Sequence, residues 1–201
     1  MKRAVLGIAT AVLAMSAPTF GQDALTERAE AAFVTSFAGG EPAVLIRTGL
    51  QDEVQRLCSE HRNAPPAGLA QLIEGSQRAV IRYPANLMGD WREGERIAGD
   101  FTGLRYDDKA GQPNGGNCHA CHQMAREELA YGTVGPSLLA YGKARGWGVA
   151  AQRLAYERIY NSQAFTACSA MPRFGHNGVL TPEQIAHLVA LLLDPGSSVN
   201  R

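Results

Sequence analysis

The stretch 115–124, GGNCHACHQM, places two cysteines and two histidines within five consecutive residues. Cys118, Cys121 and His122 fit the pattern Cys-x-x-Cys-His, which attaches a c-type haem through both thiols and supplies an iron ligand. On a helix, the cysteines at i and i+3 share one face with the histidine at i+4. The motif therefore predicts one covalently attached haem c, with His122 as the proximal ligand. His119 lies about 100° around such a helix and is expected to be a filler residue.

Other uses of clustered cysteines fit the sequence less well. A structural zinc site needs four ligands, normally with a second close pair, whereas Cys58 and Cys168 are isolated from each other. A thioredoxin-type redox pair belongs in a βαβ unit, and the chain has few alternating β runs. A chance or purely structural motif is the remaining alternative.

A bound haem needs a sixth ligand or an open site. The candidates are Met88, Met124, Met171, His61, His176 and His187. Met171 is favoured and His176 is next, because CSAMPRFGHNG is typical of a loop between two helices, far enough downstream to cross the haem, and Pro172 stiffens it. Met124 is too close to the proximal histidine, and His187 is expected on the surface of the last helix. A His/Met pair favours electron transfer, because it raises the potential and leaves no vacant position at the iron.

Pro136, in VGPSL, has two interpretations. Its carbonyl accepts the second ring N–H of His122 and fixes the tautomer, or it is an ordinary turn proline. The sequence leaves both open.

The N-terminus has the pattern of a secretory signal. Lys2 and Arg3 precede an apolar run, residues 4–15, that is too short to span a bilayer. Cleavage is expected after Gly21, and a buried N-terminal helix is the alternative. No later segment is long and apolar enough to cross a membrane, so we expect a soluble periplasmic protein with a signal peptide at 1–21 and no membrane span.

Export affects the expected oxidation state of the two cysteines outside the motif. Cys58 and Cys168 form an even remainder in an oxidising compartment, which favours a disulfide between them. Two buried free thiols are the alternative, and a rarer one makes Cys168 a thiolate ligand of the iron.

Periodic apolar positions predict a mostly α fold. The expected helices lie in the segments 25–37, 51–63, 65–81, 91–100, 147–161 and 180–195. Leu69, Leu72 and Ile73 are expected on one face of their helix. Thr181, with Gln184 at the capping-box position, gives the last helix the best-defined start.

Charge is balanced, with 19 Lys and Arg against 19 Asp and Glu, which argues against nucleic acid as a partner. The distribution is uneven. The acidic residues of the N-terminal part are Asp23, Glu27, Glu30, Glu41, Asp52, Glu53 and Glu60. The basic residues of the later part are Lys143, Arg145, Arg153, Arg158 and Arg173. They form either solvated faces or a docking surface.

Several blocks resemble one family. NGGNCHACHQM, YGTVGPSLLAYGKARG, CSAMPRFGHNG and the closing DP…SVN are similar to SoxX, the cytochrome subunit of the SoxAX complex of bacterial sulfur oxidation. The resemblance runs from about Cys58 to the C-terminus. It implies a class I-like cytochrome c domain at 88–201 behind a helical N-terminal extension at 22–87. It also implies haem attachment at Cys118 and Cys121 and axial ligation by His122 and Met171.

The resemblance implies a function as well. The chain would be the electron-transfer subunit of a heteromeric L-cysteine S-thiosulfotransferase, and it would not be catalytic alone. A SoxA-like haem subunit would join thiosulfate to a cysteine of a SoxYZ-like carrier protein. This subunit would accept the electrons and pass them to a small c-type cytochrome. The main alternative is a free periplasmic electron carrier, although such carriers are usually smaller; a haem sensor or peroxidase would want an open sixth site.

Overall fold

The computed structural model describes residues 20–36, 51–103, 108 and 113–201. Its helices are α1 (Phe20–Ser36), α3 (Glu53–Glu60), α4 (Ala67–Ala79), α5 (Trp91–Gly99), α6 (Tyr141–Arg145), α7 (Val149–Tyr160) and α8 (Pro182–Leu193), with the 3-10 turns η1 (Cys118–Ala120), η2 (Ser162–Ala164) and η3 (Ser198–Asn200). The described residues contain no β-strand, which confirms the mostly α class. The assignment to a class I-like cytochrome c domain stays a prediction.

The elements belong to two compact units. α1 lies in the first, and everything from α3 to η3 lies in the second. α1 begins at Phe20 and continues through the expected cleavage position after Gly21, while the rest of the expected signal peptide, residues 1–19, lies outside the described residues. α3 and α4, expected in the N-terminal extension, are in the same unit as the Cys-x-x-Cys-His motif.

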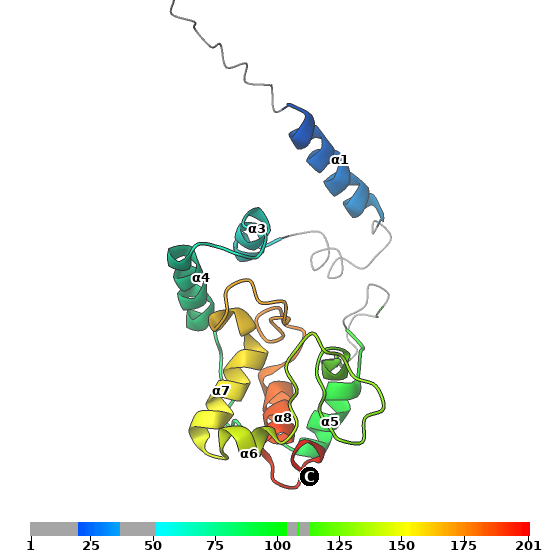
Figure 1. The fold of residues 1–201 in the computed structure, drawn as a ribbon, viewed down its shortest axis with the longest axis vertical. Coiled ribbons are helices and arrows are strands. Elements are labelled where there is room, and N and C mark those ends of the chain that lie inside the picture. The colour runs from blue at the N-terminus through cyan, green and yellow to red at the C-terminus, as the bar shows by residue number, and fades with distance from the viewer. Residues whose placement is uncertain (1–19, 37–50, 104–107, 109–112) are drawn as a thin grey trace, which may run out of the picture. The chain divides into compact units, whose positions relative to one another are not determined.

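The central element of the second unit is α8. Eight of its twelve residues are buried, as expected for a helix that is apolar nearly all round. The predicted capping box is present: Thr181 Oγ1 accepts from the Gln184 N–H at 3.2 Å, and Gln184 Oε1 accepts from the Thr181 N–H at 2.9 Å. Figure 1 shows α8 between α5 and α7, which both pack on it.

Gly94 allows α5 to approach the backbone of α8. A methyl group on Gly94 would lie 2.1 Å from the carbonyl oxygen of His187 and 2.9 Å from Leu191 Cβ. Beside this contact, the Asp90 N–H donates to His187 Nδ1 at 2.8 Å. His187 is therefore a half-buried acceptor between α5 and α8, which corrects the expectation of a surface histidine.

α4 buries only part of the face expected from the sequence. Its buried residues are Ile73 and Gln77, four positions apart on one side of the helix. Leu72, expected on the same face as Ile73, is 72% exposed. The difference follows from the narrow contact between α4 and η2, which covers only one stripe of the helix.

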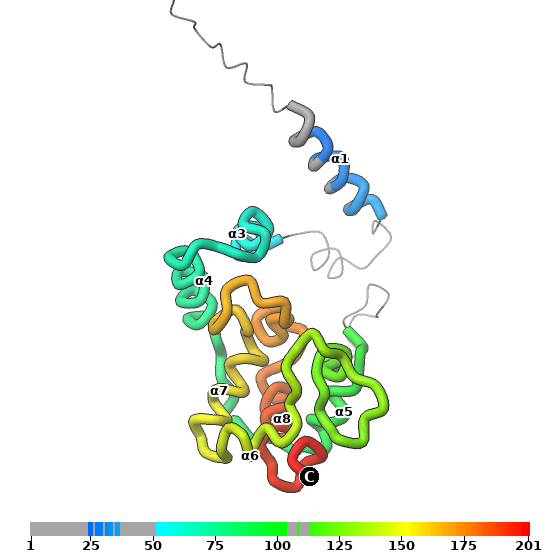
Figure 2. Tube along the Cα trace, in the orientation of Figure 1, coloured from blue at the N-terminus to red at the C-terminus, as the bar shows by residue number. Residues whose placement is uncertain are grey.

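No helix lies between η1 and α6, where the chain follows a long looped path (Figure 2). The end of this path is fixed to the C-terminus. The Ala140 N–H donates to the Val199 carbonyl at 2.8 Å, and the Gly142 N–H donates to Asn200 Oδ1 at 2.9 Å. Asn200 is buried and also donates to the Leu192 carbonyl near the end of α8, at 3.0 Å. α6 was not predicted from the sequence.

Candidate haem attachment site

The Cys-x-x-Cys-His motif forms one 3-10 turn rather than the expected helix. The carbonyl of Cys118 accepts from the N–H of Cys121 at 3.1 Å and from the N–H of His122 at 2.9 Å. Residues i and i+3 of a 3-10 turn eclipse one another. Cys118 and Cys121 therefore still share one side of the turn, as a double thioether attachment requires.

The four cysteines fall into two pairs. Cys58 and Cys168 form a disulfide, which confirms the predicted pairing over the two alternatives. Cys118 and Cys121 are free thiols and half-buried. Cys118 packs against the hydrophobic core, and this burial raises the pKa of its thiol to about 12. Cys118 and Cys121 are thus not used by the disulfide and are available for attachment to a haem.

The His122 ring has a defined tautomer. Its Nδ1 lies 2.7 Å from the carbonyl oxygen of Pro136. A carbonyl oxygen only accepts hydrogen bonds, so Nδ1 carries the proton and Nε2 keeps its lone pair for a metal. The structure selects the carbonyl-acceptor role for Pro136. Gly135 makes room for the ring, because a methyl group there would lie 2.2 Å from its Cε1.

Residues 132–138, here called the proximal loop, run beside the motif. Three backbone hydrogen bonds of 2.8–2.9 Å join them, from the N–H groups of Gly132, Gly135 and Leu138 to the carbonyls of His119, Cys121 and Gln123. This regular pairing fixes the position of Pro136 relative to the imidazole.

Gly135→Ala is expected to displace the His122 ring from Pro136. The ring is the mobile end of a side chain, so the cost to folding should be about 1 kcal/mol, comparable to one hydrogen bond. Imidazole 15N shifts should then change from the Nδ1-protonated form toward a mixture of tautomers. Gly75→Ala is the control, because a methyl group on Gly75 meets nothing within 4 Å. Unchanged 15N shifts in Gly135→Ala would contradict this.

His119 has a structural partner. Its Nδ1 lies 2.7 Å from Glu128 Oε1, and Glu128 Oε2 accepts from the Met124 N–H at 3.0 Å. The second histidine of the motif thus holds the chain that follows the motif in place through Glu128. From the motif alone, His119 was expected only to be a filler residue.

Met171 lies in the segment between η2 and α8, residues 165–181, here called the distal loop. It is half-buried and packs against the same core as Cys118. Its carbonyl accepts from Ser162 Oγ at 2.6 Å, and its N–H donates to Ser169 Oγ at 3.3 Å. The loop character of this segment is confirmed, and ligation by Met171 stays a prediction.

Other candidates for the sixth ligand have identifiable surroundings. Met124 is buried in the core, and Met88 packs against the core from outside. His61 is the C-cap of α3, where its N–H donates to the Leu57 carbonyl at 3.1 Å. None of these contacts tests ligation directly.

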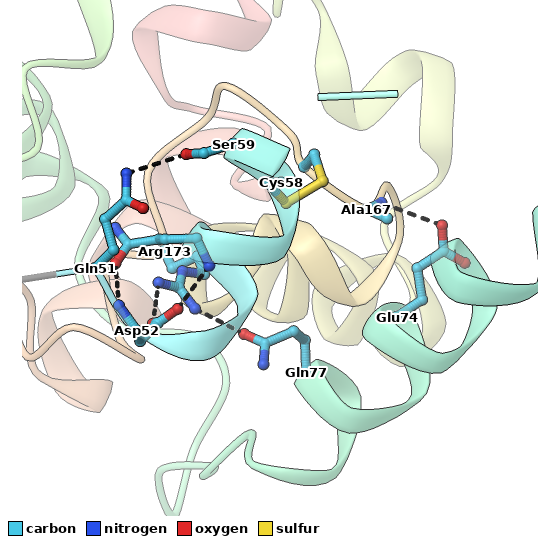
Figure 3. The surroundings of a disulfide bond; sticks show 10 residues. Gln51, Asp52, Cys58, Ser59, Glu74, Gln77, Ala167 and Arg173 are labelled. Atoms are coloured by element: carbon cyan, nitrogen blue, oxygen red, sulfur yellow. Dashed lines mark hydrogen bonds and ion pairs between the residues drawn. A yellow bond between two sulfur atoms is a disulfide. The ribbon is translucent and has the colours of Figure 1, made fainter. Parts of the chain in front are cut away.

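α3 and α4 hold the distal loop from the N-terminal side (Figure 3). Beyond the disulfide, the Ala167 N–H donates to Glu74 Oε1 at 3.2 Å. Arg173 donates to Asp52 Oδ2 at 2.5 Å and to Gln77 Oε1 at 3.0 Å. Arg173 is 3% exposed, so it belongs neither to a solvated basic face nor to a docking surface.

The same carboxylate influences the neighbouring histidine. His176 Nε2 lies 3.9 Å from Asp52 Oδ2. Burial and the charge of Arg173 lower the pKa of His176, and they outweigh the charge of Asp52, which acts to raise it. For Asp52, burial acts to raise the pKa, but hydrogen bonds from the Gln55 N–H and from Arg173 outweigh it and leave the pKa lowered. At neutral pH the cluster is an Arg–Asp ion pair beside a neutral histidine.

The described part of the chain has no helix long and apolar enough to cross a membrane. Nor do three or more His, Cys, Asp or Glu side chains converge within it as metal ligands. Haem iron would need only His122 and Met171 from this protein, so the second finding does not bear on haem. The free thiol pair and the available His122 Nε2 are the groups that a c-type haem requires.

The chain is similar to a bacterial protein of unknown activity. A protein of Aquifex aeolicus described as an uncharacterized lipoprotein is 42% identical to this chain over 158 residues, covering 75% of this chain and 73% of the relative. No protein-family model matches the chain.

Proposed function

The chain belongs to the family of the Aquifex aeolicus lipoprotein, and we propose that it is an exported monohaem c-type cytochrome. The observation that carries this proposal is the pair of free thiols three residues apart beside His122, whose Nδ1 is held by the Pro136 carbonyl. The relative's description as a lipoprotein supports export, and the cationic and apolar start of this chain supports it independently.

The proposed haem site uses four residues. Cys118 and Cys121 would hold the haem covalently, and His122 and Met171 would be the axial ligands, within a class I-like cytochrome c domain at 88–201. Bound haem supplies reversible one-electron chemistry, and the axial pair sets its potential. The protein's part is to orient His122 through Pro136 and to place the Met171 loop. The described all-helical arrangement around α8 is compatible with such a domain.

The proposed context is a periplasmic thiosulfate-oxidising complex similar to SoxAX. There the chain accepts electrons released when thiosulfate is joined to a SoxYZ-like carrier cysteine, and it passes them to a small c-type cytochrome. Support comes from the sequence blocks around Met171 and at the C-terminus. Two of their residues have structural functions here, because Arg173 is buried in an ion pair and Asn200 joins α8 to α6.

The proposed function is tested by expressing the chain in a bacterium that matures c-type cytochromes, together with a candidate SoxA-like haem subunit. We expect covalent haem on the wild type, copurification with the larger subunit, and haem reduction that depends on thiosulfate and carrier protein. Cys118→Ala with Cys121→Ala should abolish covalent haem. A haem protein that never copurifies would favour the free electron carrier, and a haem-free wild type would refute both.

The same preparations test the sixth ligand. Met171→Ala should keep covalent haem, lose the weak near-infrared sulfur-to-iron band completely and lower the midpoint potential, because the neutral thioether favours reduced iron. Met88→Ala is the matched control, since Met88 also packs against the core. If the band survived in Met171→Ala and disappeared in Met88→Ala, Met88 would be the sixth ligand and Met171 would not.

A further inference from the structure

Arg173 is a buried cation two residues after Met171. Its side chain is 3% exposed, and a buried guanidinium without partners would be strongly unfavourable. Its two partners come from outside the distal loop: Asp52 Oδ2 at 2.5 Å and Gln77 Oε1 at 3.0 Å. The charged side chain of Arg173 therefore finds its partners in residues that precede the distal loop by about a hundred positions.

Asp52 has two structural tasks in one carboxylate. Oδ1 accepts from the Gln55 N–H at 2.8 Å and caps α3, while Oδ2 pairs with Arg173. The start of α3 and the position of Arg173 are thus set by the same side chain. Because the Asp52 side chain is 41% exposed, the ion pair has one solvated member and one buried member.

Gln77 is itself held firmly. It is 6% exposed, and its Oε1 accepts from Asn161 Nδ2 at 3.0 Å as well as from Arg173. Asn161 directly precedes η2, and Ser162 of η2 donates to the Met171 carbonyl at 2.6 Å. Gln77 of α4 is therefore hydrogen-bonded both to Asn161, which precedes η2, and to Arg173, which follows Met171.

The disulfide and one further contact complete the attachment. Cys168 is bonded to Cys58 in α3, and the Ala164 carbonyl accepts from Arg78 Nη2 at 2.6 Å. These links fix the first half of the loop segment. After Met171, Arg173 contacts Asp52 and Gln77, and His176 Nε2 lies 3.9 Å from the same Asp52 carboxylate.

We propose that Arg173 is a positioning residue for Met171, acting through its ion pair with Asp52 and its hydrogen bond to Gln77. α3 and α4 thereby determine how well the distal methionine stays in place as a ligand. This role rests on the proposed function, since it concerns a sulfur that binds haem iron. Stable binding of iron by Met171 would thus require Arg173 in addition to the ligand residues themselves.

The test compares the holoprotein with its Arg173→Gln, Arg173→Lys and Asp52→Asn variants. In Arg173→Gln, amides of residues 167–176 should exchange about tenfold faster, because a buried ion pair has lost its charge. Amides of α8 should be unchanged. The near-infrared band should be lost or strongly weakened and the midpoint potential lowered, although haem stays covalently attached. Arg173→Lys should restore part of the band, since lysine keeps the charge but not the forked geometry.

Asp52→Asn provides an independent arm should Arg173→Gln fail to fold. Asparagine caps helices about as well as aspartate, so α3 is retained while the ion pair is lost. The band should weaken in the same direction but less than in Arg173→Gln. Arg153→Gln is the matched control, because Arg153 is 62% exposed and pairs with Glu157 on its own helix.

The outcomes separate the two proposals. Covalent haem with an intact band and an unchanged potential in both Arg173→Gln and Asp52→Asn would refute the positioning role alone, even if amide exchange were faster. A wild type without covalent haem would refute the proposed function and this role with it. Loss of the band in the Arg153→Gln control would show a general charge effect and would also overturn the role.

Discussion

Replacing Cys58 and Cys168 together by alanine is expected to lower the free energy of unfolding by about 4–5 kcal/mol. The two residues are 110 positions apart, and closing a loop of this size restricts the unfolded chain by about that amount in the chain-entropy account. For a protein of this size the thermal midpoint should fall by roughly 10–15 °C. Denaturant unfolding of the oxidised wild type and the double variant measures the difference.

Reduction provides the matched control for this substitution. A thiol reductant should destabilise the wild type by a similar amount and leave the double alanine variant unchanged. Amide exchange should also become faster in the distal loop, because Cys168 lies three residues before Met171 and the disulfide attaches it to α3. Equal unfolding midpoints for the reduced and oxidised wild type would contradict the prediction.

Gly94→Ala is expected to destabilise the protein by about 3 kcal/mol, at the upper end for overpacking. The added methyl group would lie 2.1 Å from the His187 carbonyl oxygen. Because both contacting groups are fixed in helices, α5 and α8 must separate, which opens the central packing of the fold. Denaturant unfolding measures the loss, and amide exchange should increase in α5 and α8 together.

Gly99→Ala is the control in the same helix. A methyl group at Gly99 meets nothing within 4 Å, and alanine is favoured over glycine in a helix by up to about 1 kcal/mol. We therefore expect no loss, or a small gain, from Gly99→Ala. Similar losses in the two variants would contradict the prediction, because they would show that the contact of Gly94 with α8 does not decide the effect.

Features that depend only on residues a few positions apart in the chain could be predicted from the sequence. The start of α8 is one, since Thr181 and Gln184 are three positions apart and the capping box they form is a local structure. The Cys-x-x-Cys-His spacing is another, because one backbone turn is enough to bring Cys118 and Cys121 to the same side. The turn is 3-10 instead of α, and the geometric argument holds for both.

The Cys58–Cys168 disulfide was predictable for a different reason. Once two of the four cysteines are assigned to the motif, the remaining two can form only one intramolecular disulfide. The pairing could therefore be predicted without knowing the fold. The number of cysteines does not determine where α3 lies. It therefore could not show that the disulfide belongs to a larger set of contacts around the Met171 loop.

The tertiary structure alone decided the roles of Arg173, Pro136 and Gly94. Arg173 was grouped with surface cations because arginine is usually exposed, but its partner Asp52 lies 121 positions away in the chain. Pro136 became an acceptor because the proximal loop pairs with the motif backbone. Gly94 contacts α8, whereas a methyl group on Gly99 would meet nothing within 4 Å, and this difference depends on how α5 packs on α8. Local patterns specify turns, caps and covalent chemistry, whereas a side chain's burial and partners depend on which distant segments pack against it.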